Sequence, residues 1–190
     1  GCASGPVRLV GHSYGAAICA EVAAARPELV RSQVLAEPSL FGLAMTNPLG
    51  AVAMAQTAAA TMHIVPLLKK GQKEKALAEF LLSVIGKEDY ARLSHRALAI
   101  MGENVETLEP MLNGMSSALA FTSKQAAKIK LPTLLIEGEK TTALFRTTMK
   151  GLAAHVPAVQ RHVLAGVGHG LHLEDPANFC RVALDFLAQH

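Results

Sequence analysis

The pattern of apolar and polar positions predicts a strand followed by a helix at both ends of the chain. Residues Val7–Val10 form a short apolar run rich in β-branched side chains, and an alanine-rich run follows with no helix breaker before Pro27. Near the other end, Gln160–Leu164 has the pattern of a strand, and the next helix is expected to begin near Pro176. The pattern at both ends of the chain is therefore typical of a folded domain with strands and helices.

The middle of the chain has a helical pattern instead. Apolar residues recur at helical spacing at Leu77, Phe80, Leu81 and Val84. The pattern stops at Gly86 and begins again with acidic residues at positions 88 and 89, which favour the first turn of a helix. We expect an all-helical segment here.

Residues 43–68 are rich in alanine and methionine, but Gln56, Thr57, Thr61 and His63 interrupt the run. We therefore do not predict a membrane span. Met45, Met54 and Met62 suit either an adaptable apolar wall of a substrate pocket or buried packing within the helical segment. The sequence leaves both interpretations open.

Composition narrows the class of protein. The chain has 190 residues, of which 51% are hydrophobic and 17% charged, with a net charge of +3, as expected of one soluble globular domain. The lysines at 69–75 and 124–130 alternate with apolar residues and lack interleaved aromatics, so we expect solvated helix faces and no nucleic-acid partner. Three scattered cysteines, Cys2, Cys19 and Cys180, predict neither a disulfide framework nor a metal site.

The pentapeptide Gly11-His12-Ser13-Tyr14-Gly15 lies where the first strand passes into the first helix. A serine nucleophile at such a turn needs small neighbours two positions away, which Gly11 and Gly15 supply. The helix N-terminus points backbone N–H groups at negative charge developing beside Ser13, and the N–H of Tyr14 is the expected first oxyanion donor. The motif predicts Ser13 as a nucleophile.

A serine nucleophile requires a base, and His169 is the best candidate among eight histidines. It lies between Gly168 and Gly170, just after the strand-like run that ends at Leu164. A histidine on a loop at a strand end can reach a serine at the end of another strand. We expect His12 to point away from the turn and His172 to be structural.

Together with the segments "RPELVRSQVLAEP", "LPTLLIEGEK" and "GVGHGLHLEDP", the pentapeptide resembles the second half of an α/β-hydrolase. The resemblance covers nearly the whole chain and implies an α/β fold of which the last four parallel strands are present. Those strands would be Val7–Gly11, Ser32–Glu37, Thr133–Gly138 and Gln160–Leu164. A helical lid would be inserted between the second and third.

The acid of the implied catalytic triad departs from the commonest family pattern. Most relatives carry an aspartate three residues after the glycine that ends the penultimate strand, and Thr141 occupies that place here. A subset of the family has its acid after the preceding strand, where this chain has Glu37. We predict a triad of Ser13, Glu37 and His169, with Glu139 as the reserve acid and a non-catalytic Glu37 as the alternative.

The resemblance implies acyl transfer by a serine hydrolase on an ester, lactone or similar carbonyl substrate, without a metal or cofactor. The expected division is a core segment over 1–42, the lid over 43–130 and a C-terminal core over 131–190. We expect an apolar small-molecule substrate, no membrane partner and a cytoplasmic location. A non-catalytic binding protein of the same fold is the alternative, because Thr141 replaces the usual acid.

The chain starts with a glycine and almost at once enters the strand of Ser13. In the family this strand is central, whereas here it would lie at an edge of the sheet. We therefore expect a fragment of a longer protein, in which upstream sequence would supply earlier strands and a second oxyanion donor.

Overall fold

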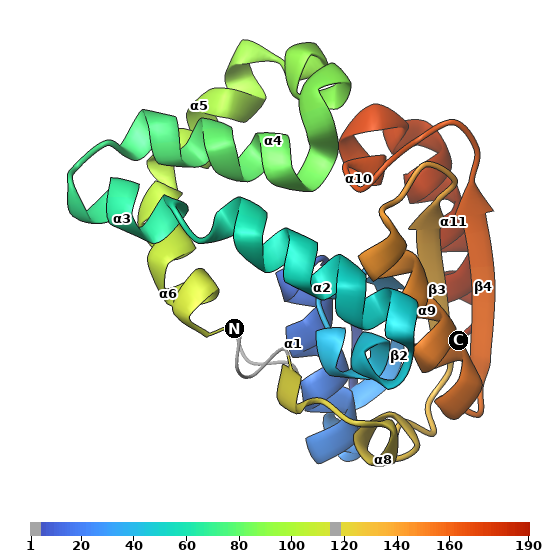
Figure 1. Ribbon diagram of the computed structural model, residues 1–190. Helices are drawn as coiled ribbons and strands as arrows, with labels where there is room; N and C mark the ends of the chain where they lie inside the picture. The colour runs from blue at the N-terminus through green and yellow to red at the C-terminus, as the bar shows by residue number, and fades with distance from the viewer. Residues whose placement is uncertain (1–4, 115–118) are drawn as a thin grey trace.

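The computed structural model describes residues 5–114 and 119–190. It contains one parallel sheet in the order β1-β2-β3-β4 (Figure 1). The strands are β1 (Val7–His12), β2 (Val30–Ala36), β3 (Thr133–Gly138) and β4 (Val159–Leu164). The four predicted strands are therefore confirmed, with boundaries within two residues, and β1 lies at an edge of the described sheet. Cys2 and residues 115–118 of the predicted helical segment lie outside the described residues.

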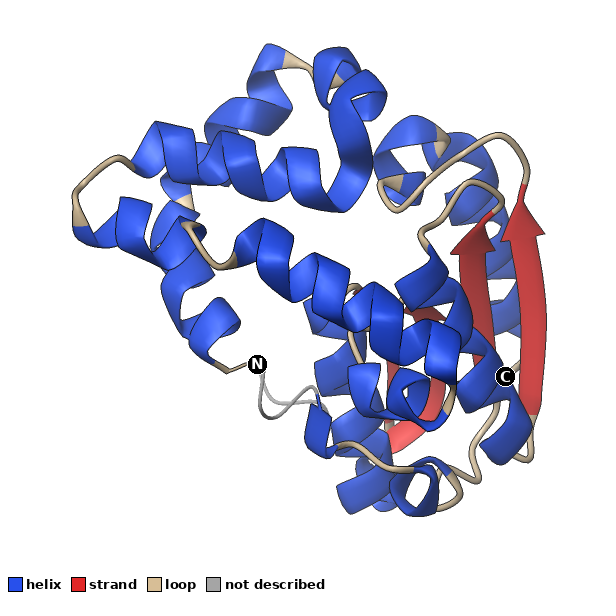
Figure 2. Ribbon diagram, viewed as in Figure 1, coloured by secondary structure: helices blue, strands red, loops and turns tan. Residues whose placement is uncertain are grey.

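Helices cover both faces of this sheet (Figure 2). Helices α1 (Tyr14–Ala25) and α9 (Ala143–His155) pack on one face, and α11 (Pro176–Gln189) packs on the other. Because successive side chains of a strand point to opposite faces, Leu35 of β2 belongs to the first core while its neighbour Val34 belongs to the second. Burial on both faces explains the apolar run at residues 134–136 in β3, whereas β2 also buries the polar residues Ser32 and Gln33.

The segment between β2 and β3, which we call the helical insert, is helical as predicted. Its residues 73–103 lie toward the carboxyl ends of the strands, whereas residues 123–126 lie near the opposite end of the sheet (Figure 1). Its longest helix bends at Gly86, whose φ of 80° is non-helical, at the position where the sequence pattern stops. Its described helices are η2 (Phe41–Thr46), α2 (Pro48–Thr61), α3 (Ile64–Lys69), α4 (Lys73–Arg92), α5 (His95–Glu103), η3 (Val105–Thr107), α6 (Leu108–Asn113) and α8 (Ser123–Ala126). Two short helices elsewhere, η1 (Pro27–Leu29) and α10 (Leu171–Glu174), were not predicted.

Helices α2 and α3 together span Pro48–Lys69, which is long and apolar enough to cross a membrane, with a mean hydropathy of 1.4. In the structure a turn at residues 62 and 63 separates the two helices, and α2 packs on α9. The segment is therefore part of the packed insert. Of its methionines, Met54 is buried in a small core, whereas Met62 is 74% exposed.

The turn between β1 and α1 makes a close approach at Gly11. A Cβ on Gly11 would lie 2.6 Å from the Cα of Ala16, because the strand and the helix meet there. A Cβ on Gly15 would meet no described atom within 4 Å, so the expected steric role belongs to Gly11 and is wrong for Gly15.

These two glycines form a matched pair for mutation. We predict that Gly11→Ala lowers the free energy of unfolding by about 1–3 kcal/mol, because backbone atoms must move to admit the methyl group. Gly15→Ala should change it by less than about 1 kcal/mol, since a helical site favours alanine. Urea unfolding followed by circular dichroism measures both, and equal effects of the two variants would contradict the close approach at Gly11.

Candidate active site

The candidate site lies at the carboxyl ends of the parallel strands, where the loops after β1, β2 and β4 converge. Ser13 follows β1, Glu37 follows β2, and His169 lies in the loop after β4. Residues more than 130 positions apart in sequence therefore come into contact because parallel strands end at one edge of the sheet.

Ser13, His169 and Glu37 form a continuous chain of hydrogen bonds. The Ser13 hydroxyl donates to Nε2 of His169 over 3.1 Å, and Nδ1 of His169 donates to Oε2 of Glu37 over 2.7 Å. This is the geometry of a nucleophile, a base and an orienting carboxylate. The structure thus brings together the three residues that the sequence predicted.

Glu139 lies away from this chain. It is exposed, and its side chain accepts a hydrogen bond from the backbone N–H of Gly166 over 2.8 Å. The structure therefore places Glu37, and not the reserve acid, against His169.

Both Ser13 and Glu37 have a left-handed backbone, with φ values of 53° and 43°. Such values are costly for residues other than glycine and persist where surrounding contacts hold them. The Ser13 N–H donates to the carbonyl of Ala36 over 2.9 Å, and the Ser13 carbonyl accepts from the N–H of Ser39 over 3.2 Å. The end of β2 therefore fixes the strained turn that presents Ser13.

The N-terminus of α1 begins at Tyr14, directly after Ser13. The backbone N–H of Tyr14 has no acceptor within the helix, since the first N–H groups of any helix lack intrahelical partners. This N–H and the positive end of the helix dipole can stabilise negative charge on an oxygen bonded to Ser13.

Thr141 has a role that the sequence did not predict. Its hydroxyl donates to Oε2 of Glu37 over 2.7 Å, and the N–H of Gly138 donates to Oε1 over 2.8 Å. The residue in the usual place of the acid therefore stabilises the acid supplied by β2. A hydroxyl residue three positions after the strand-ending glycine is the only sequence signal for this contact.

His12 does not point away from the site, contrary to expectation. Its Nε2 donates to the backbone carbonyl of His169 over 2.8 Å, and its ring lies 4.6 Å from that of His169. On the other side, the ring of Phe145 stacks on His169 at 4.0 Å and 15°. The imidazole of His169 is thus held from both sides and is only 4% exposed.

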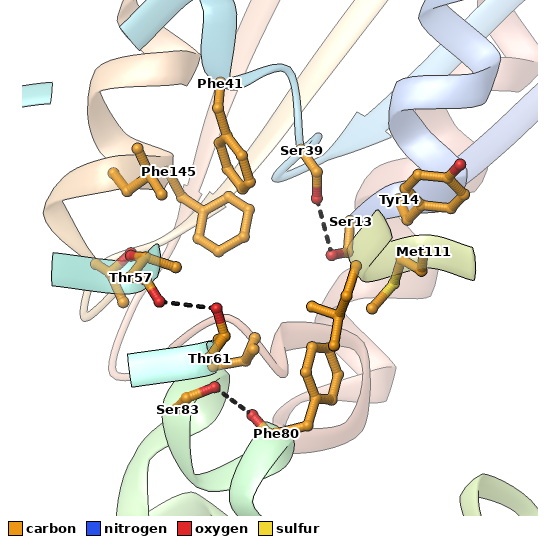
Figure 3. A pocket seen from close by; sticks show the side chains of 14 residues that line it. Ser13, Tyr14, Ser39, Phe41, Thr57, Thr61, Phe80, Ser83, Met111 and Phe145 are labelled. Atoms are coloured by element: carbon orange, nitrogen blue, oxygen red, sulfur yellow. Dashed lines mark hydrogen bonds between the residues drawn. The ribbon is translucent and has the colours of Figure 1, made fainter. Parts of the chain in front are cut away.

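Ser39 also contacts the expected nucleophile, and the sequence reasoning missed it. Its hydroxyl lies 3.3 Å from that of Ser13, as drawn in Figure 3. The signal that could have found it is its place two residues after Glu37, on the same loop.

Burial shifts the pKa values of Glu37 and His169 in opposite directions. Burial raises the pKa of Glu37 to about 7, against the opposing effects of the Gly138 N–H, the Thr141 hydroxyl and the charge of Arg146. Burial, and to a smaller extent the charge of His172, lowers the pKa of His169 to about 3. At and above neutral pH the imidazole is neutral and can accept a proton from Ser13.

No group of three histidine, cysteine or acidic side chains gathers at metal-binding distance within the residues that the structure describes. Cys19 and Cys180 are free thiols.

Comparison with known proteins identifies the class. The family model described as "Alpha/beta hydrolase family" matches residues 2–182, and the chain belongs to that family. A curated relative, the sn-1-specific diacylglycerol lipase ABHD11 of Mus musculus, is 26% identical over 193 residues, which cover 96% of this chain. The chain spans 59% of the length of that lipase.

Solved structures show the same fold. The bromoperoxidase from Bacillus anthracis matches with a TM-score of 0.76 and 21% identity, over 97% of this chain and 68% of that one. The enol-lactonase from Burkholderia xenovorans LB400 matches with a TM-score of 0.69 and 16% identity, over 97% of this chain and 66% of that one. At these identities the likeness establishes the fold alone.

The pH dependence of activity follows from the Glu37–His169 pair. The pair takes up a proton as the pH falls, and a protonated pair lacks either the carboxylate charge or the free imidazole. Activity is therefore expected above, and lost below, an apparent pKa near the value of about 7 for Glu37. The measurement is kcat/KM against pH for ester hydrolysis, and full activity retained at pH 5 would contradict it.

Removal of the Thr141 hydroxyl should shift this profile. Thr141→Val takes away a donor to the carboxylate, which raises the pKa of Glu37 further and moves the loss of activity to higher pH. We expect kcat/KM at pH 7 to fall roughly tenfold, the effect of one hydrogen bond to a charged group. Thr141→Ser keeps the hydroxyl and should retain the original profile. A valine variant with an unshifted profile would show that the contact has no influence.

Proposed function

We propose that the chain carries the catalytic residues of a serine hydrolase that cleaves an ester, lactone or similar carbonyl substrate through an acyl-enzyme. The single observation that supports this most strongly is the hydrogen-bonded chain from Ser13 through His169 to the buried Glu37. A structural role would not require a strained serine at a helix N-terminus with a neutral imidazole beside it.

The mechanism assigns one task to each group. His169 accepts the proton of Ser13 through Nε2 as Oγ attacks the carbonyl carbon. The N–H of Tyr14 stabilises the resulting oxyanion, and Glu37 stabilises the imidazolium through Nδ1. His169 then protonates the leaving oxygen, and in the second half of the reaction it activates the water that releases the acid.

The alternative, a non-catalytic binding protein, rested on the replacement of the usual acid by Thr141. The hydrogen bonds from Thr141 and His169 to Glu37 favour the hydrolase over this alternative, because they support an acid at the end of β2. The names of the similar proteins, a diacylglycerol lipase and an enol-lactonase among them, are consistent with carbonyl substrates. The helical insert would then act as the lid over the site. A soluble enzyme in the cytoplasm remains our proposal for its location.

Covalent labelling tests the nucleophile. We predict that a fluorophosphonate forms an adduct on Ser13 that mass spectrometry locates and that Ser13→Ala abolishes. The test is run on the chain as printed and on the full product of its gene. The absence of an adduct on Ser13 in both would overturn the proposal.

The same assay separates the two candidate acids. Glu37→Gln should slow labelling by roughly 10²–10⁴-fold, because an amide cannot stabilise the imidazolium or hold the same tautomer. Glu139→Gln is the matched control and should label at the original rate, since Glu139 bonds to Gly166 instead. The reverse pattern would reassign the acid to Glu139.

A further inference from the structure

Two cavities meet at Ser13, and they differ in size and lining. The first, which we call the Phe145 lobe, has a volume of about 90 Å³ and lies between the insert and α9. The second, the His172 lobe, has a volume of about 320 Å³ and runs under α4 and η3 toward α10. Both lobes are lined by Ser13, Tyr14, Phe80, Val84 and Met111, so the last three separate them above the nucleophile.

Apolar side chains form half of the lining of the Phe145 lobe, and hydroxyl-bearing side chains form the other half (Figure 3). Its apolar lining includes Phe41, Phe80, Val84, Met111, Leu144 and Phe145. Met111, rather than the three methionines singled out from the sequence, provides the adaptable thioether here.

Seven residues that line the Phe145 lobe carry a hydroxyl: Ser13, Tyr14, Ser39, Thr57, Thr61, Ser83 and Thr142. The three on α2 and α4 have already donated their hydrogen to the backbone. Thr57 donates to the carbonyl of Ala53 and Thr61 to that of Thr57, both over 2.9 Å. Ser83 donates to the carbonyl of Phe80 over 2.7 Å. These side chains therefore offer a bound group no free hydrogen-bond donor and no charge.

Neither lobe has a lysine, arginine, aspartate or glutamate among its described lining residues. A charged group bound in either lobe would therefore lose hydration without an oppositely charged lysine, arginine, aspartate or glutamate to pair with, which is costly. The site therefore favours substrates that are uncharged on both sides of the scissile bond.

The position of His169 distinguishes the two sides. His169 lines the His172 lobe and is absent from the lining of the Phe145 lobe. In the reaction proposed above, Nε2 of His169 must come within hydrogen-bond reach of the leaving oxygen to protonate it. The leaving group must therefore extend into the lobe that His169 lines, and the acyl group must occupy the other.

The geometry points to a substrate class: neutral esters that join a compact apolar acyl group to a larger apolar alcohol. This inference rests on the proposed function. The acyl group lies in the Phe145 lobe, which has room for roughly six to nine non-hydrogen atoms if each occupies about the space that a cavity needs for one water. The alcohol lies in the His172 lobe.

Water is the only reactant needed besides the ester. In acylation the bond from Ser13 Oγ to the acyl carbon forms, the bond from that carbon to the alcohol oxygen breaks, and the proton of Ser13 passes through Nε2 of His169 to the departing alcohol. In deacylation the water oxygen bonds to the acyl carbon, the bond from that carbon to Oγ breaks, and a proton of the water passes through Nε2 back to Oγ, which releases the carboxylic acid.

One variant in each lobe tests the assignment. Thr57→Leu narrows the Phe145 lobe on a helix that tolerates leucine, and Leu173→Trp narrows the His172 lobe at a residue that is 42% exposed. Neither residue is one of the proposed catalytic groups, and fluorophosphonate labelling of Ser13 in each variant shows that the protein is folded and the serine reactive. The full product of the gene is assayed with methyl acetate, methyl hexanoate, methyl decanoate and cyclohexyl acetate.

The two variants should have opposite effects. Thr57→Leu is expected to lower the kcat/KM ratio of methyl hexanoate to methyl acetate at least tenfold, while the ratio of cyclohexyl to methyl acetate changes less than twofold. Leu173→Trp should lower the kcat/KM ratio of cyclohexyl to methyl acetate at least tenfold, while the ratio of methyl hexanoate to methyl acetate changes less than twofold. In the unmodified protein, kcat/KM should be higher for methyl hexanoate than for methyl decanoate. It should be at least 100-fold higher for methyl pentanoate than for monomethyl succinate, which carries a charge on the acyl side.

The outcomes separate this inference from the proposed function. If Ser13 forms the adduct but Thr57→Leu changes the alcohol preference, or Leu173→Trp changes the acyl preference, the lobe assignment alone is overturned. Equal activity on monomethyl succinate and methyl pentanoate would overturn the requirement for an uncharged acyl group. No adduct on Ser13 would overturn the proposed function and this inference with it.

Discussion

A carboxylate with no exposure to solvent is the constraint on which the rest of the site depends. Glu37 is fully buried, and a buried carboxylate is tolerated only where donors replace its hydration. It receives the Nδ1–H of His169, the hydroxyl of Thr141 and the N–H of Gly138, which come from two different strand ends. The hydrogen bond from Nδ1 of His169 to Glu37 orients the imidazole, and in that orientation Nε2 points at Ser13.

The parallel sheet makes this arrangement possible. Its strands deliver the loops after β1, β2, β3 and β4 to one edge, and each loop contributes one part of the site. The strained backbones of Ser13 and Glu37 lie at the ends of adjacent strands and are joined by hydrogen bonds between the two turns. Neither turn would keep its conformation without the other, which links the stability of the core to the position of the nucleophile.

Much of the fold and the main residues of the site could be predicted from the sequence, because both depend on local signals. Strand-like runs, the glycines around Ser13 and His169, and the break at Gly86 are properties of a few neighbouring residues. The contact of Thr141 with Glu37 spans 104 positions, and the stacking of Phe145 on His169 depends on how α9 packs. No short pattern encodes such contacts.

The same limit applies to the helical insert. Its periodicity predicts helices, but packing decides which side chains of each helix face the site. Met111 lines both cavities, whereas Met62 lies exposed to solvent. The lining of the two lobes is therefore a property that the sequence predicts least.

The tautomer of His169 tests the central claim most directly. Nitrogen-15 NMR of the ring nitrogens at pH 8, assigned by comparison with His169→Gln, reports which nitrogen carries the proton. If the buried carboxylate of Glu37 orients this imidazole as a base, Nδ1 is protonated and Nε2 is free, and Glu37→Gln loses that preference. A proton on Nε2, or the same tautomer with and without the Glu37 carboxylate, would contradict the account.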